Sequence, residues 1–149
     1  MKAQKTEGGN YIYPVKKLIR YQFPTHINDL VMDRSEARFS EVFIVVIEPE
    51  KAPPMHCHDD TEQIFYVIEG SGVLTIGKGE QKKISVGLGD VVRIPVGEWH
   101  SIKADPDTIL KYLAIDCFGS IRNENEPTWD AHVKQLCKEQ GWDYNTVKK

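Results

Sequence analysis

Residues 54–70 read PMHCHDDTEQIFYVIEG and join a His-x-His pair to an apolar, strand-like run. Successive side chains of a strand point to opposite faces, so His56 and His58 share one face and Cys57 points away from them. Two imidazoles on one face are a suitable start for a metal site. The apolar run ends at Gly70, as a strand does where it reaches a turn. The stretch therefore predicts a strand with metal ligands at its beginning.

Segments with the same strand character recur on both sides of this stretch. They are rich in β-branched and aromatic residues and are separated by Gly, Pro, Asn and Asp. The predicted strands are residues 39–47, 63–69, 73–77, 82–86, 91–95, 101–104 and 108–118, with weaker edge strands in 11–21 and 30–32. Short strands at this spacing, without alternating helices, predict an all-β sandwich or barrel.

The periodicity changes from 2 to 3.6 near the carboxyl end. Four residues fall on one helical face: Trp129, Val133, Leu136 and Cys137. Thr128 is a suitable N-cap and Gly141 a suitable stop, which predicts a helix over 128–140. We expect a single domain over 1–149, with a flexible amino terminus (1–10), a β-barrel (11–118) and this helix.

Composition excludes several classes of function. The chain has 149 residues, is 40% hydrophobic and carries a formal charge of −3. Without a basic stripe, nucleic acid is not expected as a partner. No apolar run has the ~20 residues that a membrane span needs, and residues 1–10 lack the apolar core of a signal peptide. The three cysteines form no recognisable pair. We therefore expect a cytoplasmic protein with a small-molecule ligand.

A third histidine, His100, lies downstream and can complete a metal site with His56 and His58. Three imidazoles and one oxygen donor suit a divalent transition metal: Zn, Ni, Mn, Fe or Cu. The oxygen donor is either Glu62 or Gln63, because neighbouring strand residues point to opposite faces. Residues 59–61 are expected to form a turn or bulge, so the face of each cannot be counted from His58.

The spacing of these residues resembles the first motif of the cupin superfamily, in which His-x-His, three or four residues, Glu, six residues and Gly follow one another. Here four residues separate His58 from Gln63, and six separate Gln63 from Gly70. The count from Gly70 therefore favours Gln63 as the fourth ligand. Counting three residues from His58 gives Glu62 instead, which remains the alternative.

A second motif resembles the other half of the cupin signature. Gly89 is followed after five residues by Pro95 and Gly97, and after two more by His100. Ala104 stands where the family has Asn. The resemblance implies a double-stranded β-helix, or jelly-roll barrel, with a divalent metal held by the motif residues. The resemblance to small cupins also implies a homodimer. The apolar residues on both faces of 63–68 agree with this expectation.

A second group of candidate residues lies on the last predicted strand. Tyr112, Asp116 and Phe118 share one face, and Arg122 follows. Asp116 is a candidate general acid or base, Arg122 a candidate partner for a substrate carboxylate, and Tyr112 and Phe118 candidate substrate contacts. Arg93 is a second candidate cation, and the alternative places it on the outer face with its charge in solvent.

The spacing Asp-x-Phe-x-x-x-Arg resembles that of the small pectin-degradation cupins. It implies a metal-dependent isomerase or lyase acting on a small anionic, sugar-derived substrate. A metal-dependent dioxygenase and a non-catalytic ligand-binding protein are the alternatives. An Asp–Arg surface pair would explain the same spacing. The remaining histidines, His26 in a loop and His132 on the predicted helix, are interpreted as surface or structural residues.

Overall fold

The computed structural model describes residues 11–15, 18–119 and 122–149. The amino terminus that we expected to be flexible, residues 1–10, lies outside the described residues. Nine strands are assigned within the described ranges: β1 (Ile19–Gln22), β2 (Ile27–Met32), β3 (Ser40–Ile47), β4 (Thr61–Glu69), β5 (Ser71–Ile76), β6 (Lys82–Gly87), β7 (Val91–Ile94), β8 (His100–Ala104) and β9 (Leu110–Phe118). A short 3-10 helix, η1 (Arg34–Glu36), links β2 to β3.

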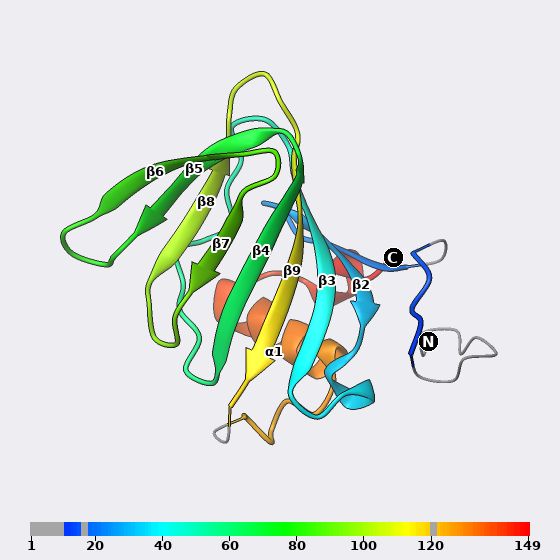
Figure 1. The fold of residues 1–149 in the computed structure, drawn as a ribbon. Helices are drawn as coiled ribbons and strands as arrows, with labels where there is room; N and C mark the ends of the chain where they lie inside the picture. Colours follow the sequence, from blue (N-terminus) through cyan, green and yellow to red (C-terminus); the bar gives the residue numbers. More distant parts are fainter. Residues whose placement is uncertain (1–10, 16–17, 120–121) are drawn as a thin grey trace.

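The strands form two antiparallel sheets. The larger has the order β1-β2-β3-β9-β4-β7 and the smaller the order β6-β5-β8. In Figure 1 the two sheets lie beside one another and α1 (Trp129–Gln140) lies behind them. This confirms the predicted all-β jelly roll with one short carboxyl-terminal helix. Only β1 forms in the segment 11–21 among its described residues, because Pro14 cannot donate to a sheet.

Alternation along β4 and β9 separates the interior of the barrel from its outer face. In β9 every second residue from Leu110 to Phe118 is buried, and in β4 the buried side chains are Thr61, Gln63, Phe65 and Val67. The outer face is also apolar. Ile44, Leu113, Tyr66 and Val91 form one row across β3, β9, β4 and β7.

The turn at Gly70 carries the chain from the larger sheet to the smaller one. Its φ is +77°, a conformation that favours glycine, and a Cβ there would collide with the carbonyl oxygen of Ile109. The backbone of the β8–β9 connection therefore approaches closely, and the apolar run of β4 ends here for a steric reason.

The helix predicted over 128–140 is α1. The side chain of Thr128 accepts from the backbone N–H of Ala131, and Gly141 ends the helix in the left-handed conformation. A further turn of helix, α2 (Tyr144–Val147), has too short a pattern to be predicted. The buried side chains of α1 and of both sheets form one core cluster. Neither helix has the length and apolar character required to cross a membrane, within the described part of the chain.

Candidate metal centre

His56, His58 and His100 converge inside the barrel. Their ligand atoms all lie within 4.8 Å of one another. His56 lies outside the named strands and pairs with His100, the first residue of β8, in an isolated antiparallel bridge. Its N–H donates to the carbonyl of His100 (3.1 Å), and the N–H of His100 donates back (2.9 Å). This bridge joins the two sequence motifs directly.

Hydrogen bonds to the backbone fix the orientation of two of the three rings. Nδ1 of His56 lies 2.6 Å from the carbonyl of Pro54, and Nδ1 of His100 lies 2.9 Å from the carbonyl of Glu98. A carbonyl only accepts, so both Nδ1 atoms carry the proton. The lone pair of each ring is therefore on Nε2, the tautomer that a second-shell carbonyl selects in a metal site.

Burial keeps all three rings neutral. It lowers the pKa of His56, lowers that of His58 well below its usual range, and, together with His56, lowers that of His100 to about 4. Nε2 of His58 and Nε2 of His100 are buried and have no hydrogen-bond partner among the described residues. Neutral imidazoles with unpaired, buried Nε2 atoms fit a divalent transition metal.

The pleat of β4 separates the two candidates for the fourth ligand. Gln63 points inward and is 5% exposed. Glu62 points outward and forms an ion pair with Arg93 (2.9 Å), with the two side chains 40% and 62% exposed. Gln63, and not Glu62, therefore shares the interior with the three histidines. Arg93 is on the outer face, as the alternative interpretation placed it, and its side chain does not line the cavity around the histidines.

A buried chain of polar groups extends from Gln63. Its amide nitrogen donates to Asp116 (2.7 Å), and Asp116 is the β-sheet neighbour of Glu41, whose carboxylate is fully buried. Arg34 contacts both oxygens of Glu41, at 2.7 and 2.9 Å. Burial and the adjacent Glu41 raise the pKa of Asp116 well above its usual range. One guanidinium is thus bound to Glu41, the neighbour of Asp116, and Asp116 holds a proton more readily than an ordinary carboxyl group does.

Arg122 and Phe118, which were predicted to contact a substrate, contact other parts of the protein instead. The guanidinium of Arg122 donates to three backbone carbonyls, those of Arg34, Ala37 and Arg38. The ring of Phe118 has the guanidinium of Arg34 at 5.0 Å and that of Arg122 also at 5.0 Å. Neither residue lines the cavity around the histidines. In the sequence they lie four residues apart because both belong to a cluster of Arg34, Phe118 and Arg122 at the end of β9.

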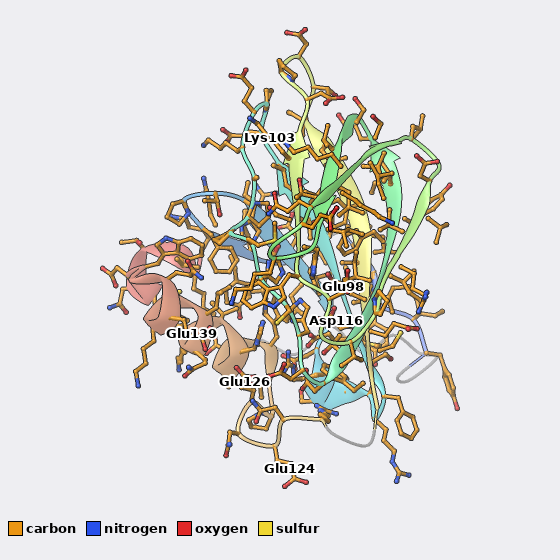
Figure 2. The ribbon with its side chains drawn as sticks, turned by 90° about the vertical axis from the view of Figure 1, so that its left-hand side faces the viewer. Glu98, Lys103, Asp116, Glu124, Glu126 and Glu139 are labelled. Carbon is orange, nitrogen blue, oxygen red and sulfur yellow. The ribbon has the colours of Figure 1, made fainter. Side chains whose placement is uncertain are left out.

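The histidines open onto a cavity of about 140 Å³. Asp116 and Tyr112 line it, as predicted for residues on the inner face of β9, together with apolar side chains of both sheets and α1. No Lys or Arg is among the described residues of the lining. In Figure 2 Asp116 lies in the middle of the molecule, and Glu139 lies on α1. A small ligand inside this cavity therefore contacts no lysine or arginine, whereas a second cavity that shares His58 and Asp116 has cationic side chains in its lining, those of Arg34, Lys134 and Lys138.

All five histidines of the chain line this cavity, so His26 and His132, which were interpreted as surface or structural residues, also face the candidate site. The ring of His26 stacks on Phe23 (4.7 Å), and burial lowers its pKa to about 3. Nδ1 of His132 lies 3.3 Å from Glu126. A signal for His132 was present, because it follows Trp129 by three residues and so shares its helical face.

The comparisons with known proteins agree with this geometry. A family model described as a cupin domain matches residues 43–116, about half of the chain. An acireductone dioxygenase from Danio rerio is 28% identical over 111 residues, covering 66% of this chain and 57% of that protein. Acireductone dioxygenase 1 from Coprinopsis cinerea is 35% identical over 77 residues, covering 50% and 39%. The chain thus spans little more than half the length of the first of these relatives and about two fifths of the second.

Solved structures share the fold at low sequence identity. A predicted oxalate decarboxylase from Thermotoga maritima superimposes with a TM-score of 0.65 at 18% identity, covering 72% of this chain and 99% of that one. The polyketide cyclase RemF from Streptomyces resistomycificus gives 0.60 at 20% identity, covering 76% and 87%. The cupin domain of CENP-C from Drosophila melanogaster gives 0.63 at 15%, covering 76% and 85%. The family match over residues 43–116, together with the two spaced motifs and the two antiparallel sheets, shows that this chain belongs to the cupin family.

Proposed function

We propose that this chain is a metal-dependent dioxygenase that acts on a small, metal-chelating oxygen compound. The observation that carries the proposal is the set of three neutral histidines in one cavity, two of which, His58 and His100, have a buried Nε2 atom without a hydrogen-bond partner among the described residues. The two curated relatives described above are named as acireductone dioxygenases, which makes an acireductone the first substrate to test.

His56, His58 and His100 would hold the metal, with the amide oxygen of Gln63 as the fourth donor. When bound, a divalent metal supplies a Lewis acid for a chelating substrate oxygen and, as Fe(II), access to dioxygen chemistry. All four donors are neutral, so the site keeps its full positive charge and favours an enolate oxygen. Asp116 holds the Gln63 amide nitrogen, and this contact aims the amide oxygen away from Asp116.

His132 is the residue best placed to move a proton in the cavity. Its Nδ1 faces Glu126, and the hydrogen bond from His132 lowers the pKa of that carboxyl group. Nε2 is then the ring atom that can accept a proton from an enol. The carboxylate of Glu126 beside the ring orients it. His132 stands on α1, separate from the metal ligands.

The lining argues against the uronate substrate implied by the pectin-cupin resemblance. A substrate carboxylate would need a cation, and both predicted arginines are engaged elsewhere, Arg93 with Glu62 and Arg122 with backbone carbonyls. An isomerase or lyase acting on a uronate would therefore lack the two arginines predicted to bind the substrate carboxylate. A chelating enediol requires only the metal and a base.

The experiment is oxygen uptake by protein stripped of metal and reloaded anaerobically with Fe(II), Ni(II) or Zn(II). We expect oxygen consumption with an acireductone and Fe(II), and none with metal-free protein. His100→Ala should lose both the metal and the activity. His132→Gln is the matched control, because it should retain one metal ion per chain while losing turnover.

Two results would contradict the proposal. Loss of the acireductone absorbance without oxygen uptake, with every metal, would indicate an isomerase or lyase instead. Tight binding of metal and acireductone without any turnover would indicate a ligand-binding protein.

A further inference from the structure

Two polar side chains of the cavity remain unexplained by the metal centre. Four buried side-chain atoms lack a hydrogen-bond partner among the described residues, and all four belong to residues that line the same cavity. Two are the Nε2 atoms of His58 and His100. The others are Oδ1 of Asn28, on β2, and Nε1 of Trp129, on α1. Folded proteins rarely leave buried polar atoms unpaired, so each such atom requires an explanation.

We propose that Asn28 and Trp129 form a second recognition point in the cavity, which binds a neutral hydroxyl or primary amide on the substrate. The inference rests on the proposed function, because the metal centre would hold the other end of the same molecule. The indole N–H of Trp129 can only donate, and Oδ1 of Asn28 can only accept. Asn28 pairs with Val45 of β3, and Trp129 packs on Phe43, which lies two residues away on the same face of that strand. One ligand group between them can therefore pair with both if it accepts one hydrogen bond and donates another, as a hydroxyl or an amide does.

Both side chains are held firmly in place. Asn28 is 5% exposed and Trp129 is 2% exposed. The ring of Trp129 packs on Phe43 at 4.5 Å and meets the edge of Tyr21 at 6.5 Å, and its backbone N–H donates to Asp33 (3.1 Å). Asn28 is paired within the sheet to Tyr21 and to Val45. Preorganised groups of this kind contribute to affinity because little side-chain entropy is lost on binding.

The charge of the lining excludes an acidic substituent at this point. No Lys or Arg lines the cavity within the described residues, and the two acidic residues of the lining are Asp116 and Glu139. A carboxylate buried here would lack a partner, which is costly. The walls near Trp129 are apolar and include Phe43, Val45 and Leu136. The substrate class is therefore a small neutral molecule with a chelating head, an apolar body and a hydroxyl or amide.

Three hydroxypyranones provide matched probes. Kojic acid, allomaltol and comenic acid share the same metal-chelating head and carry a hydroxymethyl, a methyl and a carboxylate group at the same ring position. Dissociation constants are measured by calorimetry on Ni(II)-loaded protein. We expect kojic acid to bind about tenfold more tightly than allomaltol, the value of one or two additional hydrogen bonds. Comenic acid should bind no more tightly than allomaltol.

Variants locate the preference. Trp129→Phe and Asn28→Leu should each reduce the ratio between kojic acid and allomaltol toward one, while the affinities for Ni(II) and for allomaltol change less than about threefold. Trp142→Phe is the matched control and should keep the wild-type ratio, because Trp142 packs on Phe23 outside the lining. Asn28→Leu gives an independent answer if Trp129→Phe does not fold.

The outcomes separate the two proposals. Retained Ni(II) binding with equal affinities for all three pyranones, or a preference for comenic acid, overturns the recognition point and leaves the metal centre standing. Failure of the wild-type protein to bind Ni(II) overturns the metal centre, and the recognition point with it.

Discussion

Replacing Arg34 by Met removes the cation that neutralises a buried acidic pair. Arg34 is 3% exposed and contacts Glu41, which is 0% exposed, through two hydrogen bonds. Removal of one partner from such a pair typically costs about 3–5 kcal/mol, because the remaining charge stays buried without compensation. In a chain of this size each kcal/mol lowers Tm by roughly 2–4 °C. We therefore expect Arg34→Met to lower Tm by about 10 °C.

Urea denaturation of metal-free protein at pH 7, followed by circular dichroism, gives the free energy of unfolding. Arg20→Met is the matched control. Arg20 also contacts a carboxylate, that of Asp29, through two hydrogen bonds, but its side chain is 49% exposed. An exposed pair contributes about 0–1 kcal/mol. Equal losses in the two variants would refute the assignment of Arg34 as the buried counter-ion.

Three further outcomes are expected. Burial alone would raise the pKa of Asp130, but hydrogen bonds from Tyr144, Lys148 and Tyr21 outweigh burial and lower the pKa to about 2. The ionised carboxylate therefore stabilises the fold above about pH 4, and this stabilisation is lost as the pH falls toward 2. The stability gap between wild type and Asp130→Asn, on the order of 2 kcal/mol at pH 6, should close on acidification in urea titrations, and a gap that widens would contradict this reading. Metal at about 100 times its Kd should raise Tm by roughly 5–10 °C in a thermal scan, with no rise for His58→Ala or for protein treated with a chelator. Two copies should associate through the apolar outer row that contains Tyr66, whose side chain is 47% exposed. In analytical ultracentrifugation Tyr66→Lys should sediment as a monomer. Tyr11→Lys changes a residue outside this row and should sediment like the wild type.

Much of the barrel could be predicted because it depends on local pattern. Alternation, turn residues and the two spaced motifs located most strands, and the count from Gly70 identified Gln63 as the inward residue. Counting from His58 failed because residues 59–60 form a bend that breaks the alternation. The caps of α1 were readable because Thr128 and Gly141 act within one turn of the helix.

The rest depends on contacts that spacing does not reveal. Arg93 and Arg122 were candidate substrate cations, yet each is held by a partner distant in sequence. His132 was interpreted as a surface or structural residue because the neighbours of a helical face depend on how the helix packs, which its sequence does not specify. The burial of Asn28 has no signal in the sequence, because a polar residue on a strand near the edge of a sheet normally faces solvent. Its burial follows from the way α1 covers that end of the barrel.

The last strand in the described part of the chain occupies the middle of the larger sheet. β9 (Leu110–Phe118) pairs with β3 on one side and with β4 on the other. Until these residues emerge from the ribosome, β3 and β4 each present an open edge and the barrel has no continuous wall. Chains that end before residue 110 should aggregate, because the edges of β3 and β4 remain unpaired and can bind strands of other chains. We therefore expect the larger sheet to form only after β9 is complete, with the edges of β3 and β4 unpaired until then.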